Sequence, residues 1–255
     1  MTNPAGTPIW YELMTPDPDG AKRFYDDVVG WTIGAQSDAP MDYRMITAPG
    51  GMTGGVMRLS PEMQAAGARP LWTVYFGVDD TDAATARAKE LGAHVFVPPT
   101  DIPDVGRFAL LGDPQHAPFY IMKGSSDQTS GVFAPGERGR CSWNELWTHD
   151  VDASLKFYGA MFGIENRETM DMGDLGGYHF LDLGGVRIGA AAAMKNDPPQ
   201  WLPYFCVDDV DAAAERARAA GGTVDMGPMA VPGGSRIVVG TDPQSARFAL
   251  VAPKA

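Results

Sequence analysis

The stretch WYELMTPDPDGAKRFYDDVVGW (Trp10–Trp31) decides the fold, because it returns further along the chain as WNELWTHDVDASLKFYGAMFGI (Trp143–Ile164). Both stretches open on Trp-x-Glu and carry a Phe-Tyr pair followed by a glycine, and matching residues are 143 − 10 = 133 positions apart. The repeated units of solenoids are only about 20 to 50 residues long. This spacing therefore predicts that a whole small domain has been duplicated.

The likeness continues beyond these stretches at a smaller offset. The Asp-Pro-Gln turn at Asp113 matches the one at Asp242, which is 242 − 113 = 129 positions further on. Residues 125–138 are rich in Ser, Gly and Pro and match neither copy, which is typical of a linker. We predict two modules, residues 5–124 and 139–253, joined by that linker.

The composition limits the class of protein. The chain of 255 residues has a net charge of −12 at pH 7, and 44% of its residues are hydrophobic, enough for one or two cores. The acidity argues against a nucleic-acid partner, since binding to phosphates needs clustered Lys and Arg. Cys141 and Cys206 both lie in the second copy, so they are not a repeated disulfide framework. No run is long and apolar enough for a membrane span, and the N-terminus lacks the pattern of a signal peptide. We predict a cytoplasmic monomer or homodimer whose partner is a small molecule.

Each copy is predicted to contain two βαβββ segments. In the first copy, Asp17 is placed to cap a helix that has Pro18 at its first position, and an apolar stripe at steps of three and four residues ends at Gly30. A second helix is expected from Asp80 to Leu91. The strands expected in this copy are Ile9–Met14, Trp31–Gly34, Tyr43–Ala48, Met52–Leu59, Trp72–Val78, Val95–Val97, Arg107–Leu111 and Phe119–Met122. The predicted class is α+β, with curved mixed sheets and helices on their convex faces.

This pattern resembles a known family. A paired βαβββ module with a D-x-x-x-(A/S)-x-x-F-Y helix and a late R-x-(A/V)-x-x-x-D-P-Q turn resembles the vicinal oxygen chelate superfamily, and it is most similar to the glyoxalase and bleomycin-resistance branch. The resemblance covers nearly the whole chain. It implies tandem glyoxalase-like modules with ligand sites on the concave faces of the sheets. It leaves the activity open among glyoxalases, dioxygenases, epimerases, thiol transferases that act on antibiotics, and metal-free drug-binding proteins.

The resemblance also implies where a metal would be held. Metal enzymes of this superfamily place His, Gln or Glu ligands on the first, central and last strands of a module. The positions that would carry them here are Trp10, Thr73 and Tyr120 in the first copy and Trp143, Leu202 and Ala249 in the second. None of these is a good ligand for a divalent ion, so we expect no cofactor.

A shared metal site is the alternative. A shift of two residues in the first strand would bring Glu12 and Glu145 to the ligand position. One carboxylate per module is too few for a site, unless the two modules share one. His149 and His179 would then be the further ligands by position. A divalent metal is therefore possible but not expected.

Glu12 and Glu145 are the candidate catalytic residues of the repeated stretch. Each lies in the middle of a predicted strand among large apolar residues, where a carboxylate could act as a general base or hold a polar group of a ligand. Strand alternation gives each glutamate neighbours on its own face. The neighbours predicted to contact a ligand are Trp10, Met14, Trp143 and Trp147. The structural alternative is a buried ion pair with Arg107 or Arg236.

Tyrosines on later strands complete the predicted site. Tyr75 and Tyr204 match on the central strands and could stack on a ligand ring or bond to its carbonyl. Tyr120 is the third candidate catalytic residue, to steady a developing oxyanion, and its match is Ala249, so the two copies are predicted to differ. His179 is a further predicted contact of the ligand. The 14 methionines suggest a flexible lining for a bulky apolar ligand, or ordinary core filling.

Three functions follow from these residues. The leading prediction is a glyoxalase-like lyase or isomerase that acts on or binds a carbonyl-bearing or aromatic ligand without a tightly bound metal. The alternative is a non-catalytic binding or resistance protein for a drug or metabolite, in which the tryptophans stack on the ligand. The third is a metal-dependent glyoxalase or dioxygenase with a site shared between the modules.

Overall fold

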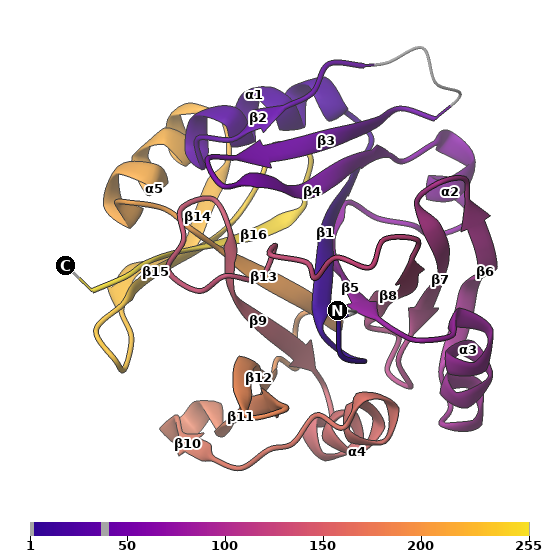
Figure 1. Ribbon diagram of the computed structural model, residues 1–255. Coiled ribbons are helices and arrows are strands. Elements are labelled where there is room, and N and C mark those ends of the chain that lie inside the picture. The colour runs from indigo at the N-terminus through magenta and orange to yellow at the C-terminus, as the bar shows by residue number, and fades with distance from the viewer. Residues whose placement is uncertain (1–2, 37–40, 255) are drawn as a thin grey trace. The chain divides into compact units, whose positions relative to one another are not determined.

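The computed structural model describes residues 3–36 and 41–254 (Figure 1). The chain divides into two compact units, and each unit combines segments from both copies of the repeat. The first, called here the Glu145 unit, comprises Met1–Ile9, Thr73–Ser130 and Trp143–Trp201. The second, called the Glu12 unit, comprises Trp10–Trp72, Gly131–Ser142 and Leu202–Ala255. The module boundaries drawn from the sequence stay a prediction.

Within the described residues, the strands form two eight-stranded mixed sheets, one for each copy of the repeat. Their orders are β2-β3-β4-β1-β5-β8-β7-β6 and β10-β11-β12-β9-β13-β16-β15-β14. The strands of the first copy are β1 (Pro8–Thr15), β2 (Thr32–Ile33), β3 (Tyr43–Ala48), β4 (Gly51–Arg58), β5 (Leu71–Gly77), β6 (His94–Ile102), β7 (Gly106–Gly112) and β8 (Pro118–Gly124). Those of the second copy are β9 (Cys141–Thr148), β10 (Thr169–Asp171), β11 (Gly177–Leu183), β12 (Val186–Ala193), β13 (Gln200–Cys206), β14 (Thr223–Ala230), β15 (Arg236–Thr241) and β16 (Arg247–Ala252). The predicted α+β class with one mixed sheet for each tandem module is confirmed.

Aspartates cap four of the five α-helices in the described residues, as the sequence predicts for Asp17, and Ser60 caps α2. The helices are α1 (Pro18–Val28), α2 (Pro61–Ala65), α3 (Thr81–Glu90), α4 (Val151–Phe162) and α5 (Val210–Ala219), with a 3₁₀ turn at Gly173–Leu175. The Asp17 carboxylate accepts a hydrogen bond from the backbone N–H of Gly20 at 2.9 Å, and Pro18 occupies the first turn. Asp80, Asp150 and Asp209 cap α3, α4 and α5 in the same way. None of the helices in the described ranges is long and apolar enough to cross a bilayer.

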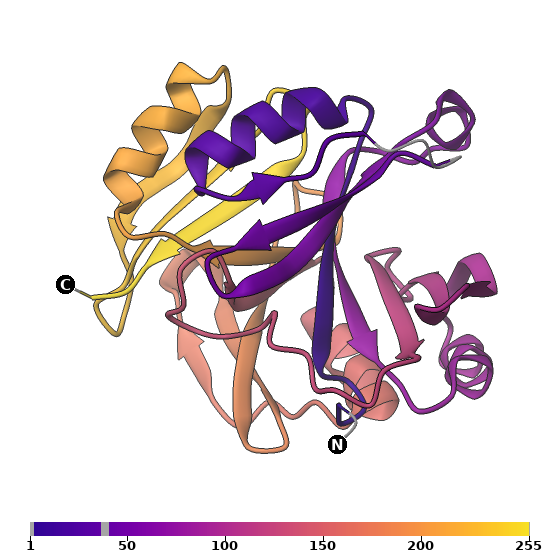
Figure 2. The same cartoon turned by 45° about the horizontal axis from the view of Figure 1, so that its top comes forward.

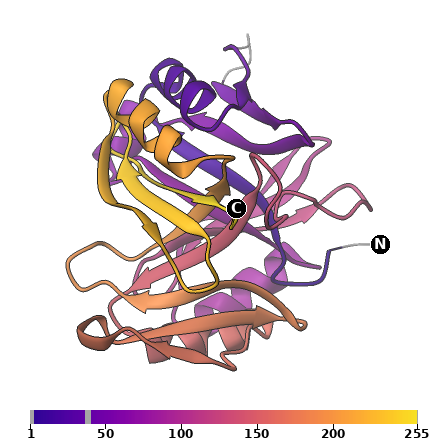
Figure 3. The same cartoon turned by 90° about the vertical axis from the view of Figure 1, so that its left-hand side faces the viewer.

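In the Glu12 unit, α1 and α5 lie side by side, as Figures 2 and 3 show. The ring of Phe24 meets that of Phe248 edge to face, with 5.4 Å between centroids. Tyr25, the other half of the Phe-Tyr pair, donates its hydroxyl proton to Asp242 at 2.9 Å and accepts from the indole N–H of Trp72 at 3.0 Å. All these side chains are buried. The repeated Phe-Tyr and Asp-Pro-Gln motifs are therefore partners in one core.

The Glu145 unit repeats this arrangement with its own residues. Tyr158 on α4 donates its hydroxyl proton to Asp113 at 3.3 Å and accepts from the indole N–H of Trp201 at 2.9 Å. The other oxygen of Asp113 accepts two backbone N–H groups of its own turn. Gln115 of the same turn bonds to the first residues of α4, through Asp150 and Ser154. Asp113 and Gln115 of the Asp-Pro-Gln turn thus join α4 to the β7–β8 turn.

Candidate functional site

Four side chains of the Glu145 unit form a hydrogen-bonded group, called here the Glu145 cluster. Strand β9 presents Trp143, Glu145 and Trp147 on one face by alternation, and β11 contributes Tyr178. The indole N–H of Trp147 donates to Oε1 of Glu145 at 2.6 Å, and the hydroxyl of Tyr178 donates to Oε2 at 2.6 Å. The indole N–H of Trp143 donates to the Tyr178 oxygen at 2.8 Å. The carboxylate is therefore fixed from both sides by short bonds.

Small residues on β12 make this arrangement possible. In the register of the sheet, Glu145 lies opposite Ala190 and Tyr178 lies opposite Ala192. These methyl side chains leave room for the Tyr178 ring to reach across β12 to the glutamate on β9. A side chain on Gly189 would collide with the backbone oxygen of Asn144, so a glycine is needed where β12 lies against β9.

The electrostatics of the cluster make it an acceptor of hydrogen bonds. Burial, followed by the charge of Glu145, raises the pKa of Tyr178 well above its ordinary value, so the phenol keeps its proton and donates it. The N–H groups of Trp143 and Trp147 also point at partners inside the cluster. A carboxylate can accept up to about four hydrogen bonds. Glu145 can therefore accept a further bond from a ligand, while the three donors are already committed.

The Glu12 unit contains a related group, called here the Glu12 cluster, made of Trp10, Glu12 and Tyr43. The indole N–H of Trp10 donates to the Tyr43 oxygen at 2.8 Å, and the Tyr43 hydroxyl is hydrogen-bonded to Glu12. Burial, then the Glu12 charge, raises the pKa of Tyr43 well above its ordinary value. A side chain on Gly55 would strike the Tyr43 ring, so that ring lies directly over the backbone of β4. Glu12 is 1% exposed, so it is deeply buried.

The two clusters differ at one predicted site residue. Trp147 supplies a second donor to Glu145, whereas the matching residue Met14 packs with Met57, Leu59 and Leu71 in an apolar group. The Trp–Tyr–glutamate chain is therefore common to both copies, but the tryptophan on the far side of the carboxylate belongs to the second copy.

The ion pairs considered for the two glutamates are not formed. Arg107 pairs with Asp82 at 2.7 Å and Asp101 at 3.0 Å, and Arg236 pairs with Asp211 at 2.8 Å. The predicted pairing of Arg107 and Arg236 with the two glutamates is therefore wrong. Asp82 and Asp211 lie on the helices α3 and α5, and Asp101 lies on β6. Each arginine therefore pairs with elements of its own βαβββ segment.

Sequence reasoning missed Tyr43 and Tyr178, which hold the glutamates. They match each other at 178 − 43 = 135 in the two copies. The signal that could have found them is a tyrosine retained in the same predicted strand of both copies. The sequence analysis instead predicts its neighbour His179, but alternation along β11 places that side chain on the opposite face from Tyr178. His179 contacts Thr169 at 3.2 Å, and the structure does not bring it to the Glu145 cluster.

The predicted tyrosines on the central strands lie in different surroundings. In the Glu145 unit, Tyr75 and Tyr120 face each other across β5 and β8, and their rings stack with 4.0 Å between centroids and 12° between planes. Both are buried. In the Glu12 unit, Tyr204 lies opposite Ala249 in the matching register. The structure thus brings Tyr75 and Tyr120 together, and the catalytic role of Tyr120 stays a prediction.

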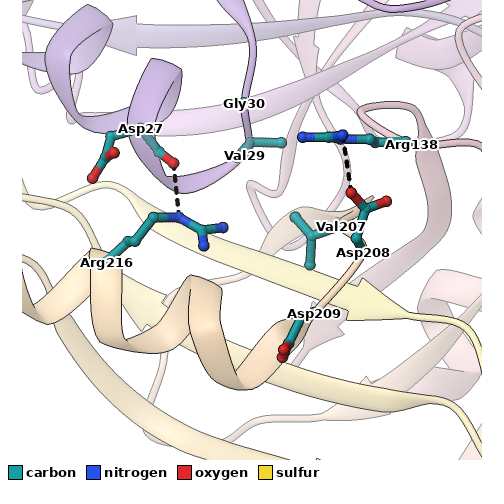
Figure 4. Close-up of a pocket in the computed structure, with 8 residues that line it drawn as sticks. All are labelled: Asp27, Val29, Gly30, Arg138, Val207, Asp208, Asp209 and Arg216. Atoms are coloured by element: carbon teal, nitrogen blue, oxygen red, sulfur yellow. Dashed lines mark hydrogen bonds and ion pairs between the residues drawn. The ribbon is translucent and has the colours of Figure 1, made fainter. Parts of the chain in front are cut away.

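A separate hollow of about 160 Å³ lies in the Glu12 unit at the end of α1 (Figure 4). Its lining residues are Asp27, Val29, Gly30, Arg138, Val207, Asp208, Asp209 and Arg216. Arg216 donates to the backbone oxygens of Asp27 and Val28, and Arg138 pairs with Asp208 at 2.9 Å. A cation at the last carbonyls of a helix stabilises the helix end. We therefore interpret this hollow as a structural junction, and it contains none of the site residues predicted from the sequence.

The comparisons with known proteins agree with this fold. The family model of the Glyoxalase/Bleomycin resistance protein/Dioxygenase superfamily matches residues 8–120 and 140–250, so the chain belongs to this superfamily. It is 34% identical over 255 residues to the protein named "Putative glyoxylase CFP32" of Mycobacterium bovis, and this alignment covers 97% of this chain and 95% of that relative. It is 31% identical over 261 residues to "Anthracycline biosynthesis protein DauV" of Streptomyces sp. strain C5, which covers 96% of this chain and 93% of that relative. The 2,3-dioxygenase LapB from Pseudomonas sp. KL28 has a similar fold, with a TM-score of 0.67 at 13% identity over 99% of this chain and 94% of that one.

The described residues do not fit the divalent metal that the resemblance in the sequence implies. In residues 3–36 and 41–254, no three His, Cys, Asp or Glu side chains are arranged to hold a metal ion. His149, considered as a ligand, bonds to the backbone oxygen of Asp197 at 3.1 Å. The oxygens of Glu145 accept hydrogen bonds from an indole and a phenol. No step of the function proposed below therefore passes through a metal.

A chelation experiment tests the expectation that no metal is needed. We expect dialysis against EDTA to change the affinity for a phenolic probe, 4-hydroxyacetophenone, by less than about twofold. The Glu145 cluster offers a single carboxylate, whereas a metal needs several converging donors. Calorimetric titration before and after dialysis measures this. Elemental analysis of protein purified without added metal is the control, and about one divalent ion per chain would contradict the expectation.

Proposed function

We propose that this protein binds a small aromatic molecule that carries a hydroxyl or N–H group, and that Glu145 accepts the hydrogen bond from that group. The observation that supports this most is the placement of the Glu145 carboxylate between Trp147 and Tyr178. The carboxylate is fixed, partly exposed and surrounded by aromatic side chains. The relative named for anthracycline biosynthesis supports an aromatic ligand, since it is 31% identical along nearly the whole chain.

The three hydrogen-bond donors of the Glu145 cluster already bond to acceptors within it, which favours binding over catalysis. Enolate chemistry needs a hydrogen-bond donor aimed at the oxygen where negative charge develops. The Tyr178 proton is directed to Glu145, and the Trp143 and Trp147 protons are directed to Tyr178 and Glu145. The cluster therefore recognises a donor on the ligand better than it would stabilise an oxyanion.

Lyase or isomerase activity is the second candidate. The relative named as a glyoxylase, at 34% identity, favours it, and so does the deep burial of Glu12, since a carboxylate among apolar side chains suits proton transfer. In this version Glu12 or Glu145 moves a proton next to a ligand carbonyl and Tyr120 steadies the developing charge. Mass spectrometry of the ligand after incubation separates the two, because a binding protein leaves the ligand unchanged.

The substitution Glu145→Gln tests the proposed function. We expect it to weaken binding of a phenolic ligand about 10- to 100-fold, since a hydrogen bond to a charged group contributes about 1.5 to 3 kcal/mol. Calorimetric titration with 4-hydroxyacetophenone measures the affinity, and thermal unfolding shows that the variant is folded. Glu215→Gln is the matched control, because that glutamate is exposed on α5 and pairs with Arg218. Equal affinities of Glu145→Gln and the unmodified protein would refute the proposal.

A further inference from the structure

The rings of Trp143 and Tyr178 lie in nearly one plane. Their planes differ by 5°, and their centroids are 6.5 Å apart. In the face-to-face stack of Tyr75 and Tyr120 the corresponding distance is 4.0 Å, so Trp143 and Tyr178 cannot be stacked in that way. The bond from the indole N–H to the phenol oxygen, which lie in the planes of their own rings, joins the two edge to edge. We call this flat surface the Trp143–Tyr178 platform.

Phe180 is nearly perpendicular to both rings of the platform. Its ring is turned 85° from Trp143 and 87° from Tyr178, with centroids 6.0 and 5.6 Å away. The guanidinium of Arg187 lies 4.2 Å from the Phe180 ring centroid and is itself held by Asp182 and Glu168. The Phe180 ring therefore contacts both the Arg187 cation and the two rings of the platform.

The platform and the carboxylate together define the shape of a ligand. We propose that the platform binds a planar fused-ring aromatic compound of about two or three rings, whose hydroxyl or N–H group donates to Glu145. This inference rests on the proposed function and narrows its ligand class. Two coplanar rings offer a fused-ring compound a continuous stacking surface, whereas a single-ring compound covers only part of it. The donor on the ligand is required because the donors of the cluster are already committed.

The matching residues in the first copy do not make the same surface. Met45 occupies the position of Phe180, at 180 − 45 = 135, and is 39% exposed. Met14 occupies the position of Trp147 and belongs to an apolar group. Methionine side chains adapt to many shapes and do not select a flat one. The fused-ring site is therefore assigned to the second copy.

The test compares ligands of different size on the unmodified protein and on Trp143→Leu. The probes are 2-hydroxyanthraquinone, which has three fused rings and a free hydroxyl, its 2-methoxy analogue, which lacks the donor, and 4-hydroxyacetophenone, which has one ring. We expect the three-ring phenol to bind about tenfold or more tightly than the one-ring phenol, because stacking contributes about 1 to 3 kcal/mol for a ring system of base size. The methoxy analogue is expected to lose about tenfold or more, since it cannot donate to Glu145.

In Trp143→Leu the advantage of the three-ring phenol over the one-ring phenol is expected to fall to about threefold or less. Phe96→Leu is the control for loss of an exposed aromatic ring, since Phe96 is 50% exposed on β6. Thermal unfolding checks that each variant is folded, and Trp143→Phe, which keeps a smaller ring, should retain part of the selectivity.

The outcomes separate this inference from the proposed function. If Glu145→Gln weakens both phenols but Trp143→Leu leaves their affinity ratio unchanged, the platform is refuted and the proposed function stands. If Glu145→Gln weakens neither compound, the proposed function is refuted and the platform with it. Binding of neither phenol by the unmodified protein refutes both.

Discussion

Replacing Asp42 by asparagine is expected to lower the free energy of unfolding at neutral pH by about 3 kcal/mol, because it leaves a buried arginine without its main partner. Arg44 is 1% exposed and Asp42 is 7% exposed. The guanidinium donates to both oxygens of Asp42, at 2.8 and 3.0 Å, and to Asp19 at 2.6 Å. Arg58 also donates to Asp42, at 2.9 Å. Losing this carboxylate therefore leaves two cations facing a neutral amide, and one of them, Arg44, has a buried side chain.

The contribution of Asp42 to the free energy of unfolding should decrease in acid. Hydrogen bonds from Arg44 first, and then from Arg58, hold the pKa of Asp42 below its ordinary value despite burial. The stability that it contributes is therefore fully present above the unfolded pKa of an aspartate, about 3.9, and is lost as the pH falls through its lowered folded pKa. The difference between the unmodified protein and Asp42→Asn should be constant near neutral pH and should shrink in strong acid.

Urea unfolding at about pH 7, 5 and 3 measures both effects. Asp101→Asn is the control, because that carboxylate is exposed and its bond to Arg107 is one that solvent screens, so its loss should cost much less. A loss for Asp42→Asn no larger than for Asp101→Asn would contradict the role assigned to the buried arginine. A difference that grows on acidification would contradict the assigned sign.

The second large effect is expected for the buried tyrosines of the Phe-Tyr pairs. Tyr158→Phe should lower the free energy of unfolding by about 2 to 3 kcal/mol, because it leaves the Trp201 N–H and one Asp113 oxygen without the hydroxyl between them. Tyr25→Phe should cost a similar amount in the Glu12 unit, where Trp72 and Asp242 flank the hydroxyl. Urea unfolding of the two variants, with ligand affinity as a second measurement, checks this.

Asp113→Asn is the control for the tyrosine variants, because Asp113 accepts the hydrogen bond from Tyr158. Burial raises the pKa of Asp113, which is the opposite direction from Asp42. A raised pKa means that the contribution of this carboxyl to stability is greatest below about 3.9 and falls as the pH rises through the folded value. Asp113→Asn should therefore lose less stability relative to the unmodified protein at neutral pH than in acid. Ligand affinity that falls with Tyr158→Phe while stability stays constant would show that this hydroxyl serves the site and not the core.

Part of the candidate site could be predicted from the sequence, because duplication marks residues by repetition. Glu12 and Glu145 stand out as carboxylates in matching strands, and alternation correctly groups Trp143 and Trp147 with Glu145. Their partners could not be derived in the same way. Tyr178 lies on a strand two places away in the sheet, and its contact with Glu145 depends on the register of β12 between them.

His179 and Tyr178 show how strongly the composition of the site depends on strand register. Adjacent residues of a strand point to opposite faces, so an error of one position exchanges a residue of the site for one on the other side of the sheet. The ion pairs assumed for Arg107 and Arg236 failed for a related reason. The prediction needs each arginine on a strand next to its glutamate, but two strands lie between β1 and β7 and two lie between β9 and β15. Aspartates of α3 and α5 pair with the arginines instead.

The sequence by itself determined the duplication, the βαβββ order, the superfamily and the pair of glutamates, because these depend on local spacing and on side-chain alternation. The tertiary structure decided which donors hold each glutamate, that the Trp143 and Tyr178 rings share a plane, and that the Phe-Tyr and Asp-Pro-Gln motifs meet in a buried hydrogen-bond chain. Apart from the bond between Trp147 and Glu145, these bonds join residues at least 43 − 12 = 31 positions apart, and Tyr25 and Asp242 are 217 positions apart. Contacts over such separations are set by strand register and by helix packing, and no local pattern in the sequence specifies either one.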